Sequence, residues 1–188
     1  MIGLFIILSL VVLFFLWGML LYNALVRANN SCDEAWSNVD TELKRRYDLI
    51  PNLVEAVKAY ATHERTVLQG VSEARTRAIA STGSPASQAR DENVLVSNVR
   101  QLLAIVERYP ELKADQNFRK LQEELINTED RIQATRRFYS ANVRDFNNLV
   151  QSVPSNLIAQ RFGFREREYF EIENAMERTP VTVDLQRK

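Results

Sequence analysis

The longest apolar run in the chain covers residues 1–22 and contains no charged side chain. A bilayer core about 30 Å thick needs roughly 20 apolar residues at about 1.5 Å of rise each, and this run meets that requirement. A cleaved signal peptide would need a basic start, an apolar core of about 7–15 residues and a cleavage site of small residues. The run lacks the basic start and the cleavage site and is too long, so it predicts a retained transmembrane anchor.

Beyond the anchor, apolar side chains recur at alternating spacings of three and four residues, which is typical of long helices packed lengthwise. The most regular series ends before Pro154, because proline disfavours helical geometry just ahead of it. Asp115 is expected to cap the start of this helix. The positions of the series are Phe118, Leu121, Leu125, Thr128, Ile132, Thr135, Tyr139, Asn142, Phe146, Leu149 and Val153.

A second series covers residues 39–78, and its phase continues across Pro51. An interrupting loop would usually reset the phase, so the continuity predicts one helix that is kinked at Pro51. Asp48 and Asn52 are expected to hydrogen-bond the donors that the proline frees.

A third series covers residues 95–109 and stops at Pro110, whereas the small, polar residues 81–87 predict a loop. Short connections between long amphipathic helices imply antiparallel neighbours. The chain is therefore expected to be all-α. The predicted parts are a transmembrane anchor at residues 1–22, an antiparallel four-helix bundle with long helices at residues 23–164, and a tail at residues 165–188.

Near the carboxyl end the pattern is weaker. Ser155 is expected to cap a short helix that reaches Arg161, and the aromatic residues 162–164 are expected to dock on the bundle. Residues 181–183 alternate like a strand but are too few to assign, so the end is expected to be loosely ordered.

Composition and motifs give no support for chemistry. Acidic and basic residues balance at 24 each, so no net field recruits nucleic acid. The single cysteine, Cys32, excludes an intramolecular disulfide, and its place on a helical series predicts a small buried residue. The only histidine, His63, lacks a second histidine at position 67, where Val67 stands, so the zinc-protease motif is absent. We therefore expect no enzymatic activity, no cofactor, no metal and no small-molecule substrate.

Some polar side chains occupy core-type positions: Arg46 and Glu64 on one series, and Thr128, Thr135 and Asn142 on another. A buried charge is costly unless it is paired and hydrogen-bonded. In one interpretation these side chains satisfy one another, or reach the edge of the bundle, and fix the helix register. In the other, a polar stripe faces a second copy of the chain.

Several motifs of the chain are unusual, and the most specific is Arg45-Arg46-Tyr47-Asp48-Leu49-Ile50-Pro51-Asn52-Leu53. Others are Lys58 to Glu64, Glu107 to Lys113, Leu121 to Leu125, Thr128 to Ile132, Arg136 to Tyr139 and Pro154 to Phe164. These motifs resemble those of the LemA family, over nearly the whole chain to about Phe170. Such proteins are bacterial membrane proteins with one amino-terminal helix and a four-helix soluble domain, so the resemblance implies this architecture, an external amino terminus and no established catalytic activity.

Within the most specific motif, Arg45 and Arg46 lie where they are expected to meet Glu129 or Asp130 of the long helix. We predict a buried or half-buried ion pair between these groups.

Two functions fit these features. The first is a non-enzymatic scaffold or assembly protein that self-associates at the bacterial cytoplasmic membrane. The second is an accessory subunit that docks onto a membrane enzyme such as a peptidase. The expected partners are membrane lipid, further copies of the chain and a possible membrane protein. Arg27, Lys44, Arg45 and Arg46 follow the anchor, which favours an external amino terminus and a cytoplasmic body.

Overall fold

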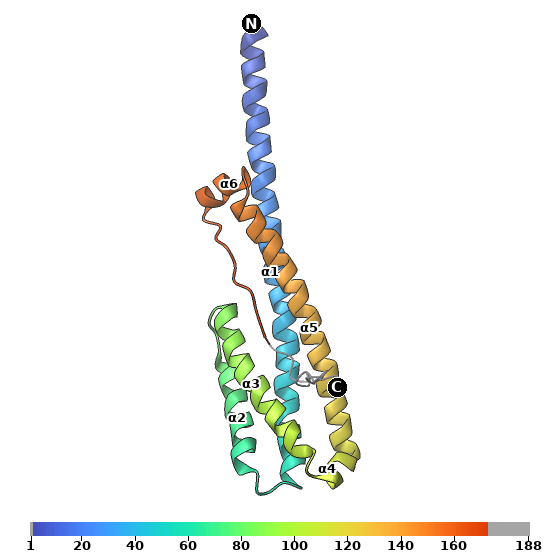
Figure 1. Ribbon diagram of the computed structural model, residues 1–188. Helices are drawn as coiled ribbons and strands as arrows, with labels where there is room; N and C mark the ends of the chain where they lie inside the picture. The colour runs from blue at the N-terminus through green and yellow to red at the C-terminus, as the bar shows by residue number, and fades with distance from the viewer. Residues whose placement is uncertain (1, 173–188) are drawn as a thin grey trace, which may run out of the picture. The chain divides into compact units, whose positions relative to one another are not determined.

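The structure is a computed structural model, and it describes residues 2–172. These residues form six helices and no strand, which confirms the all-α prediction for this part of the chain (Figure 1). The helices are α1 (Ile2–Lys58), α2 (Arg65–Ala80), α3 (Pro85–Val106), α4 (Pro110–Ala114), α5 (Gln116–Gln151) and α6 (Ser155–Phe162). Residues 181–183 and the role of residues 174–188 lie outside the described residues.

The described residues fall into two compact units, and α1 and α5 contribute to both. The first unit comprises the residues up to Lys44, Gly83–Ala86 and Ile132–Glu171. The second comprises Arg45–Thr82, Ser87–Arg131 and Ile172. The predicted boundaries after residues 22 and 164, and the antiparallel four-helix arrangement, stay predictions.

In the first unit, the beginning of α1 carries a bare apolar surface. From Ile2 to Leu20 its large apolar side chains are exposed, ranging from 44% at Trp17 to 79% at Ile2. The helix is long and apolar enough to cross a membrane. Further along, α1 is covered by the rest of the unit, and Leu25 is fully buried. An apolar stretch left uncovered next to a buried one fits a membrane location.

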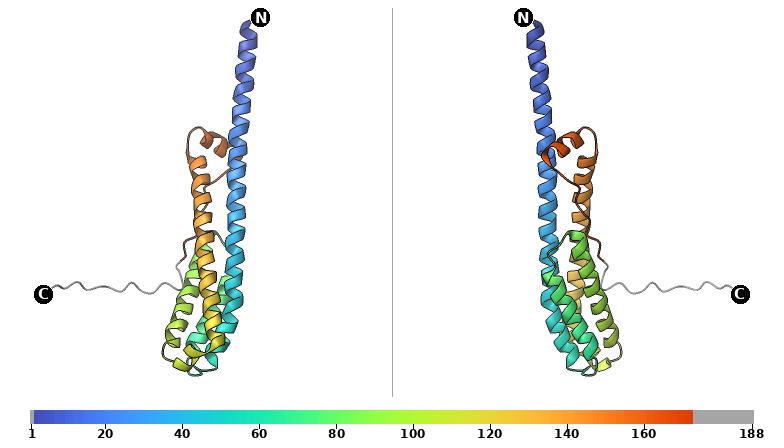
Figure 2. Two further views of the ribbon diagram at one scale, coloured as in Figure 1. Left: turned by 90° about the vertical axis from the view of Figure 1, so that its right-hand side faces the viewer. Right: turned by 90° about the vertical axis from the view of Figure 1, so that its left-hand side faces the viewer.

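The end of the first unit is a non-helical segment that returns along α1 and α5 (Figure 2). It leaves α6 at Gly163, whose φ of 77° lies in the left-handed region that a helix end favours for glycine. Farther along, Phe170 is buried and packs edge-on against Trp36 of α1, with ring centroids 5.2 Å apart. The ring of Trp36 also lies 5.3 Å from that of Tyr139 on α5. Phe164 also lies 6.3 Å from Phe146 of α5 between ring centroids, so the predicted docked aromatic segment is confirmed at Phe164 and extends to Phe170, whereas Phe162 is 59% exposed.

The short helix predicted after Pro154 is also confirmed as α6, but its cap was predicted wrongly. The residue at the cap position is Pro154, which makes no side-chain capping bond. The hydroxyl of Ser155 instead donates to the carbonyl of Ser152 at 3.0 Å, so it faces back into the preceding turn.

In the second unit, α1 continues through Pro51 to Lys58, as the pattern predicted, but the series does not stay helical to Ala78. Residues 59–64 form a turn, in which Tyr60 is exposed and Ala61 is buried. The turn leaves α2 in step with the phase of α1, and periodicity alone does not reveal such a break.

Proline plays different parts at the other helix ends. α3 ends at Val106, and Pro110 opens the short helix α4 instead of only stopping its predecessor, because proline is well tolerated at a first helical position. The N-cap of α5 is confirmed, since the backbone N–H of Phe118 donates to Oδ1 of Asp115 at 2.8 Å. α5 ends at Gln151, and Val153 is 80% exposed instead of completing the apolar series.

Gly70 of α2 lies close to the side chain of Asn98 on α3 in this unit. A Cβ atom at Gly70 would lie 2.8 Å from Oδ1 of Asn98. Only a residue without a side chain fits there unless Asn98 moves.

Candidate functional site

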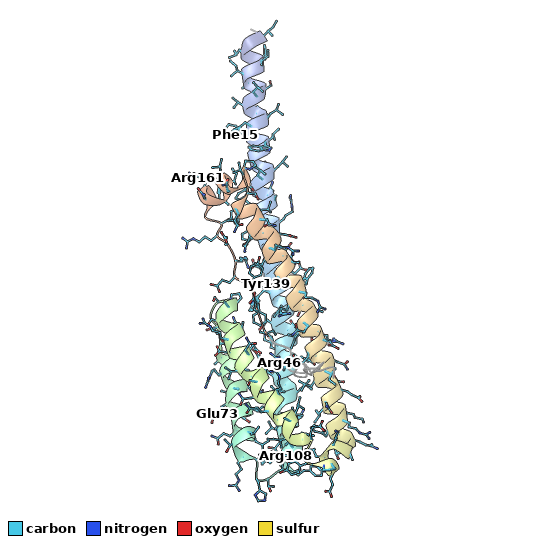
Figure 3. The ribbon with its side chains drawn as sticks, in the orientation of Figure 1. Phe15, Arg46, Glu73, Arg108, Tyr139 and Arg161 are labelled. Atoms are coloured by element: carbon cyan, nitrogen blue, oxygen red, sulfur yellow. The ribbon has the colours of Figure 1, made fainter. Side chains whose placement is uncertain are left out.

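The second unit contains a buried ionic cluster around Arg46 of α1. Its guanidinium group is fully buried, and Nη1 donates to Oε1 of Glu129 on α5 at 2.9 Å. Nη2 donates to Oε2 of Glu92 on α3, whose side chain is 2% exposed. One cation from α1, which Figure 3 labels, therefore joins carboxylates of α3 and α5 inside the unit.

The neighbouring residue extends the cluster. The hydroxyl of Tyr47 donates to Oε1 of Glu92, so both oxygens of that carboxylate accept hydrogen bonds. The backbone carbonyl of Tyr47 accepts a hydrogen bond from Nε of Arg75 on α2, at 2.6 Å. Helices α1, α2, α3 and α5 are thus joined through two consecutive residues of α1.

The electrostatics of the cluster hold Arg46 in its charged form. Burial by itself would lower the pKa of Arg46, but the carboxylates of Glu129 and Glu92 outweigh this effect and raise it above the ordinary value. Nε of Arg46 and Oε2 of Glu129 make no hydrogen bond within the described residues. The cluster is therefore paired in charge, while two of its polar atoms have no hydrogen-bond partner there.

The arrangement is suited to holding helices in register rather than to chemistry on a substrate. Its charged side chains are 0–2% exposed, so a substrate in solution does not reach them. Within residues 2–172 there is no group of three side chains placed to hold a metal ion. A buried salt bridge adds little net stability over apolar packing, but removing one partner leaves an uncompensated charge. The cluster joins side chains of α1, α3 and α5.

The predicted ion pair is confirmed for Arg46 and Glu129, whereas Arg45 and Asp130 are exposed. Pro51 lies inside α1, and the kink predicted there stays a prediction. The partners assigned to Pro51 were wrong. A proline deprives the carbonyl four residues earlier of its helical donor, so the group left over is the acceptor at Tyr47. Arg75 supplies the donor.

The remaining candidates are satisfied locally. Glu64 accepts a hydrogen bond from Arg108 at 2.8 Å, near the surface of the second unit. Asn142 donates to the carbonyl of Phe138 at 2.9 Å. The hydroxyls of Thr128 and Thr135 bond carbonyls of their own helix. Local and mutual pairing is thus the interpretation that these contacts favour, and Arg46 offers no group to a second copy.

A second polar contact, in the first unit, was not predicted. Nη2 of Arg167 donates to Oδ1 of Asn29 at 2.9 Å and lies 2.7 Å from Oδ1 of Asp33, so it joins the returning segment to α1. The side chain of Asn147 on α5 accepts from the backbone N–H of Arg167 at 2.8 Å and donates to its carbonyl at 3.0 Å. The guanidinium group also lies 5.9 Å from the ring centre of Phe146.

Comparison with known sequences agrees with this architecture. A sequence profile of the LemA family matches residues 35–185. The chain belongs to the LemA family. It is 26% identical over 189 residues to magnetosome protein MamQ 2 of Paramagnetospirillum magneticum. This alignment covers 87% of the chain and 70% of that protein.

Two further relatives have similar identity. Magnetosome protein MamQ of Magnetospirillum gryphiswaldense is 26% identical over 174 residues, 79% of this LemA-family chain and 64% of that protein. Protein LemA of Metamycoplasma hominis is 24% identical over 140 residues, 74% of the chain and 64% of that protein. All three relatives come from bacteria, and none of their names states a reaction.

Proposed function

We propose that the protein is a non-enzymatic, membrane-anchored scaffold that self-associates at the bacterial cytoplasmic membrane. The observation that carries the proposal is the continuity of α1 in the first unit. The exposed apolar stretch from Ile2 to Leu20 passes without a break into a part of the helix that has one buried face, from Leu25 onward. Since no loop separates anchor from packed helix, the bilayer fixes the direction in which the first unit projects.

The state of the polar residues supports a structural role. The charges around Arg46 are turned toward one another in the second unit, and those around Arg167 join chain segments in the first. These side chains are occupied in holding the fold. We also propose that the helices of the second unit form an antiparallel four-helix bundle, in which the Arg46 cluster sets the register.

A groove on the first unit is the surface we assign to self-association. It has a volume of about 320 Å³ and is lined by Asn38, Thr41 and Glu42 of α1 and by Ala134, Thr135 and Phe138 of α5. Phe138 is 56% exposed, which is unusual for so large an apolar side chain on a packed helix. A second copy is the partner that the anchor favours, because confinement to a membrane raises the local concentration of copies in two dimensions.

The test is the mass of the full chain in mild detergent. A homo-oligomer is expected, and Phe138→Asp is expected to convert it to a monomer. Ile79→Asp is the matched control, since Ile79 is a comparably exposed apolar residue of the second unit, at 48%. A monomeric wild type, or stoichiometric recovery of a different protein, would contradict self-association and favour an accessory subunit of a membrane enzyme.

The side of the membrane needs a separate experiment. In a Cys32→Ser background, Ser37→Cys places a thiol at an exposed position of the first unit. A membrane-impermeant maleimide is expected to label it only after the cells are lysed. Labelling in intact cells would overturn the cytoplasmic placement and leave the anchor itself untouched.

A further inference from the structure

The short helix α6 and the turn before it carry large apolar side chains that the first unit leaves uncovered. Val153 is 80% exposed, Leu157 64% and Phe162 59%. Val153 lies in the turn before α6, whereas Leu157 and Phe162 lie on the helix itself. Ser155 and Ala159 of α6 are buried in the unit, and Phe162, three residues after Ala159, lies on that same side of the helix.

This apolar patch lies beside the end of the anchor. The ring of Tyr22 on α1 is 4.7 Å from that of Phe162 and 5.9 Å from that of Phe164, measured between centroids. Tyr22 marks the point where α1 changes from bare to covered, between the exposed Leu20 and the fully buried Leu25. Figure 1 and Figure 2 show α6 beside α1 at this level, and Figure 3 shows Phe15 on the bare stretch of α1 beyond it.

The length of the bare stretch sets the level of the membrane surface. From Ile2 to Leu20, at about 1.5 Å of rise per residue, the helix extends about 28 Å. The hydrocarbon core of a bilayer is about 30 Å thick. If α1 spans the bilayer, its exposed apolar stretch crosses the whole hydrocarbon core, and Tyr22 lies in the headgroup region. The helix that contacts Tyr22 is then at the level of the headgroups.

Basic side chains on and just after α6 lie at the same level as Tyr22. Arg161 is exposed and stands four residues after Leu157, on a neighbouring part of the helix surface. Arg165 is exposed just beyond the end of α6. Arginine beside apolar side chains is the combination found in helices that lie in a membrane interface, where guanidinium groups bind lipid phosphates.

We propose that α6 is an interfacial element that lies on the bilayer surface, with Val153, Leu157 and Phe162 in the boundary between headgroups and acyl chains and with Arg161 on lipid phosphate. The occupant is lipid rather than a second protein because the patch continues the apolar surface of α1 through Tyr22 and Phe162. This inference rests on the membrane anchor of the proposed function. It adds a second contact with the bilayer, which restricts tilting and rotation of the first unit at the membrane.

The test measures the depth of single spin labels in the full chain. In a Cys32→Ser background, nitroxides are attached at Leu157→Cys, at Val12→Cys in the bare stretch, and at Arg137→Cys. Arg137 is an exposed position of α5 in the same unit and serves as the water-facing control. The protein is reconstituted in vesicles of phosphatidylcholine and phosphatidylglycerol, and collision rates with oxygen and with a water-soluble nickel chelate are recorded.

The expected ratio of oxygen to nickel collisions at position 157 lies well above that at 137 and below that at 12. A ratio at 157 equal to that at 137, with 12 still deep in the bilayer, would overturn the interfacial role and leave the anchor standing. Exclusion of both reagents at 157 would show a protein cover and overturn it as well. A ratio at 12 equal to that at 137 would show that the anchor itself does not span, and the proposed function would fail with it.

Discussion

Arg75 donates a hydrogen bond from Nε to the backbone carbonyl oxygen of Tyr47, at 2.6 Å. That carbonyl is the one that Pro51 leaves without a helical donor, because proline has no N–H to offer the residue four positions earlier. A side chain of α2 thus satisfies a backbone group of α1, and the proline inside α1 is tolerated through a partner 28 residues away.

This relationship predicts that the effects of substitutions at the two positions depend on each other. Arg75→Met is expected to cost about 1 kcal/mol of unfolding free energy, because a part-buried carbonyl loses its donor. In a Pro51→Ala background the cost is expected to be smaller, since the new backbone N–H bonds Tyr47 within the helix. Urea unfolding of the detergent-solubilised protein, followed by circular dichroism, measures the four variants of the cycle.

Arg77→Met is the control for that cycle, because Arg77 lies on the same helix but is exposed. It is expected to change the unfolding free energy by less than about 0.5 kcal/mol. An equal cost of Arg75→Met with Pro51 and with Ala at that position would mean that Arg75 does not act through the freed carbonyl.

The buried cluster predicts a steep loss of stability when its cation is removed. Arg46→Met is expected to cost about 3–5 kcal/mol, because Glu92 and Glu129 are left buried without a counter-charge. The triple variant Arg46→Met, Glu92→Leu, Glu129→Leu is expected to recover most of the loss. The matched control is Arg45→Met, an exposed neighbour for which a change below about 0.5 kcal/mol is expected.

Urea unfolding of these variants tests whether the Arg46 cluster contributes to the stability of the fold. If Arg46→Met and Arg45→Met have similar unfolding midpoints, the pairing of Arg46 with its carboxylates contributes nothing that solvent does not replace.

The Arg46 cluster also shows which contacts can be predicted from the sequence. The sequence predicts an ion pair between Arg45 or Arg46 and Glu129 or Asp130, and of these the structure pairs Arg46 with Glu129. Glu92 was missed, although it stands seven residues before Val99 and so continues the third apolar series upstream. The spacing places Glu92 on the buried face of that helix. An acidic residue at the start of an apolar series is nevertheless expected to be exposed unless a buried basic partner is known.

Other features left no periodic signal at all. Arg167 and Asn29 are 138 residues apart, and the segment that carries Arg167 has no regular secondary structure. The donor for the Tyr47 carbonyl likewise depends on how α2 packs on α1, which spacing along the chain does not encode. The turn at residues 59–64 kept the phase of its neighbours and was therefore missed. Sequence patterns predicted helices and apolar faces, whereas contacts made by tertiary packing required coordinates.

Tyr139 predicts a dependence of stability on alkaline pH. Burial disfavours the charged phenolate and raises the pKa of Tyr139 to about 12. An unfolded tyrosine ionises at about pH 10, so below that pH both states keep the proton and this residue adds no pH dependence. As the pH rises from about 10 toward 12, the unfolded state loses the proton first, and the native state is expected to lose stability.

Tyr139→Phe is expected to remove that alkaline loss of stability. Near neutral pH the variant is expected to be less stable by about 0.5–1.5 kcal/mol, since the hydroxyl donates to the carbonyl of Glu168 at 2.9 Å. Urea midpoints of wild type and variant, recorded from neutral to alkaline pH, are expected to converge. Tyr60→Phe, at an exposed tyrosine, is expected to keep the profile of the wild type. Parallel profiles for Tyr139→Phe and wild type would contradict the assignment.

The contacts of Arg167 predict how firmly the returning segment is held in the first unit. Arg167→Lys keeps the charge but loses the planar group that meets Asn29 and Asp33 together, at an expected cost of about 1 kcal/mol because the site is partly exposed. Trp36, which packs on Phe170 of that segment, reports the loosening. In a Trp17→Phe background its emission is expected to shift to the red at lower urea than in the parent. Arg165→Lys, two residues away and exposed, is expected to leave the transition unchanged, and identical transitions for both variants would show that Arg167 does not hold the segment.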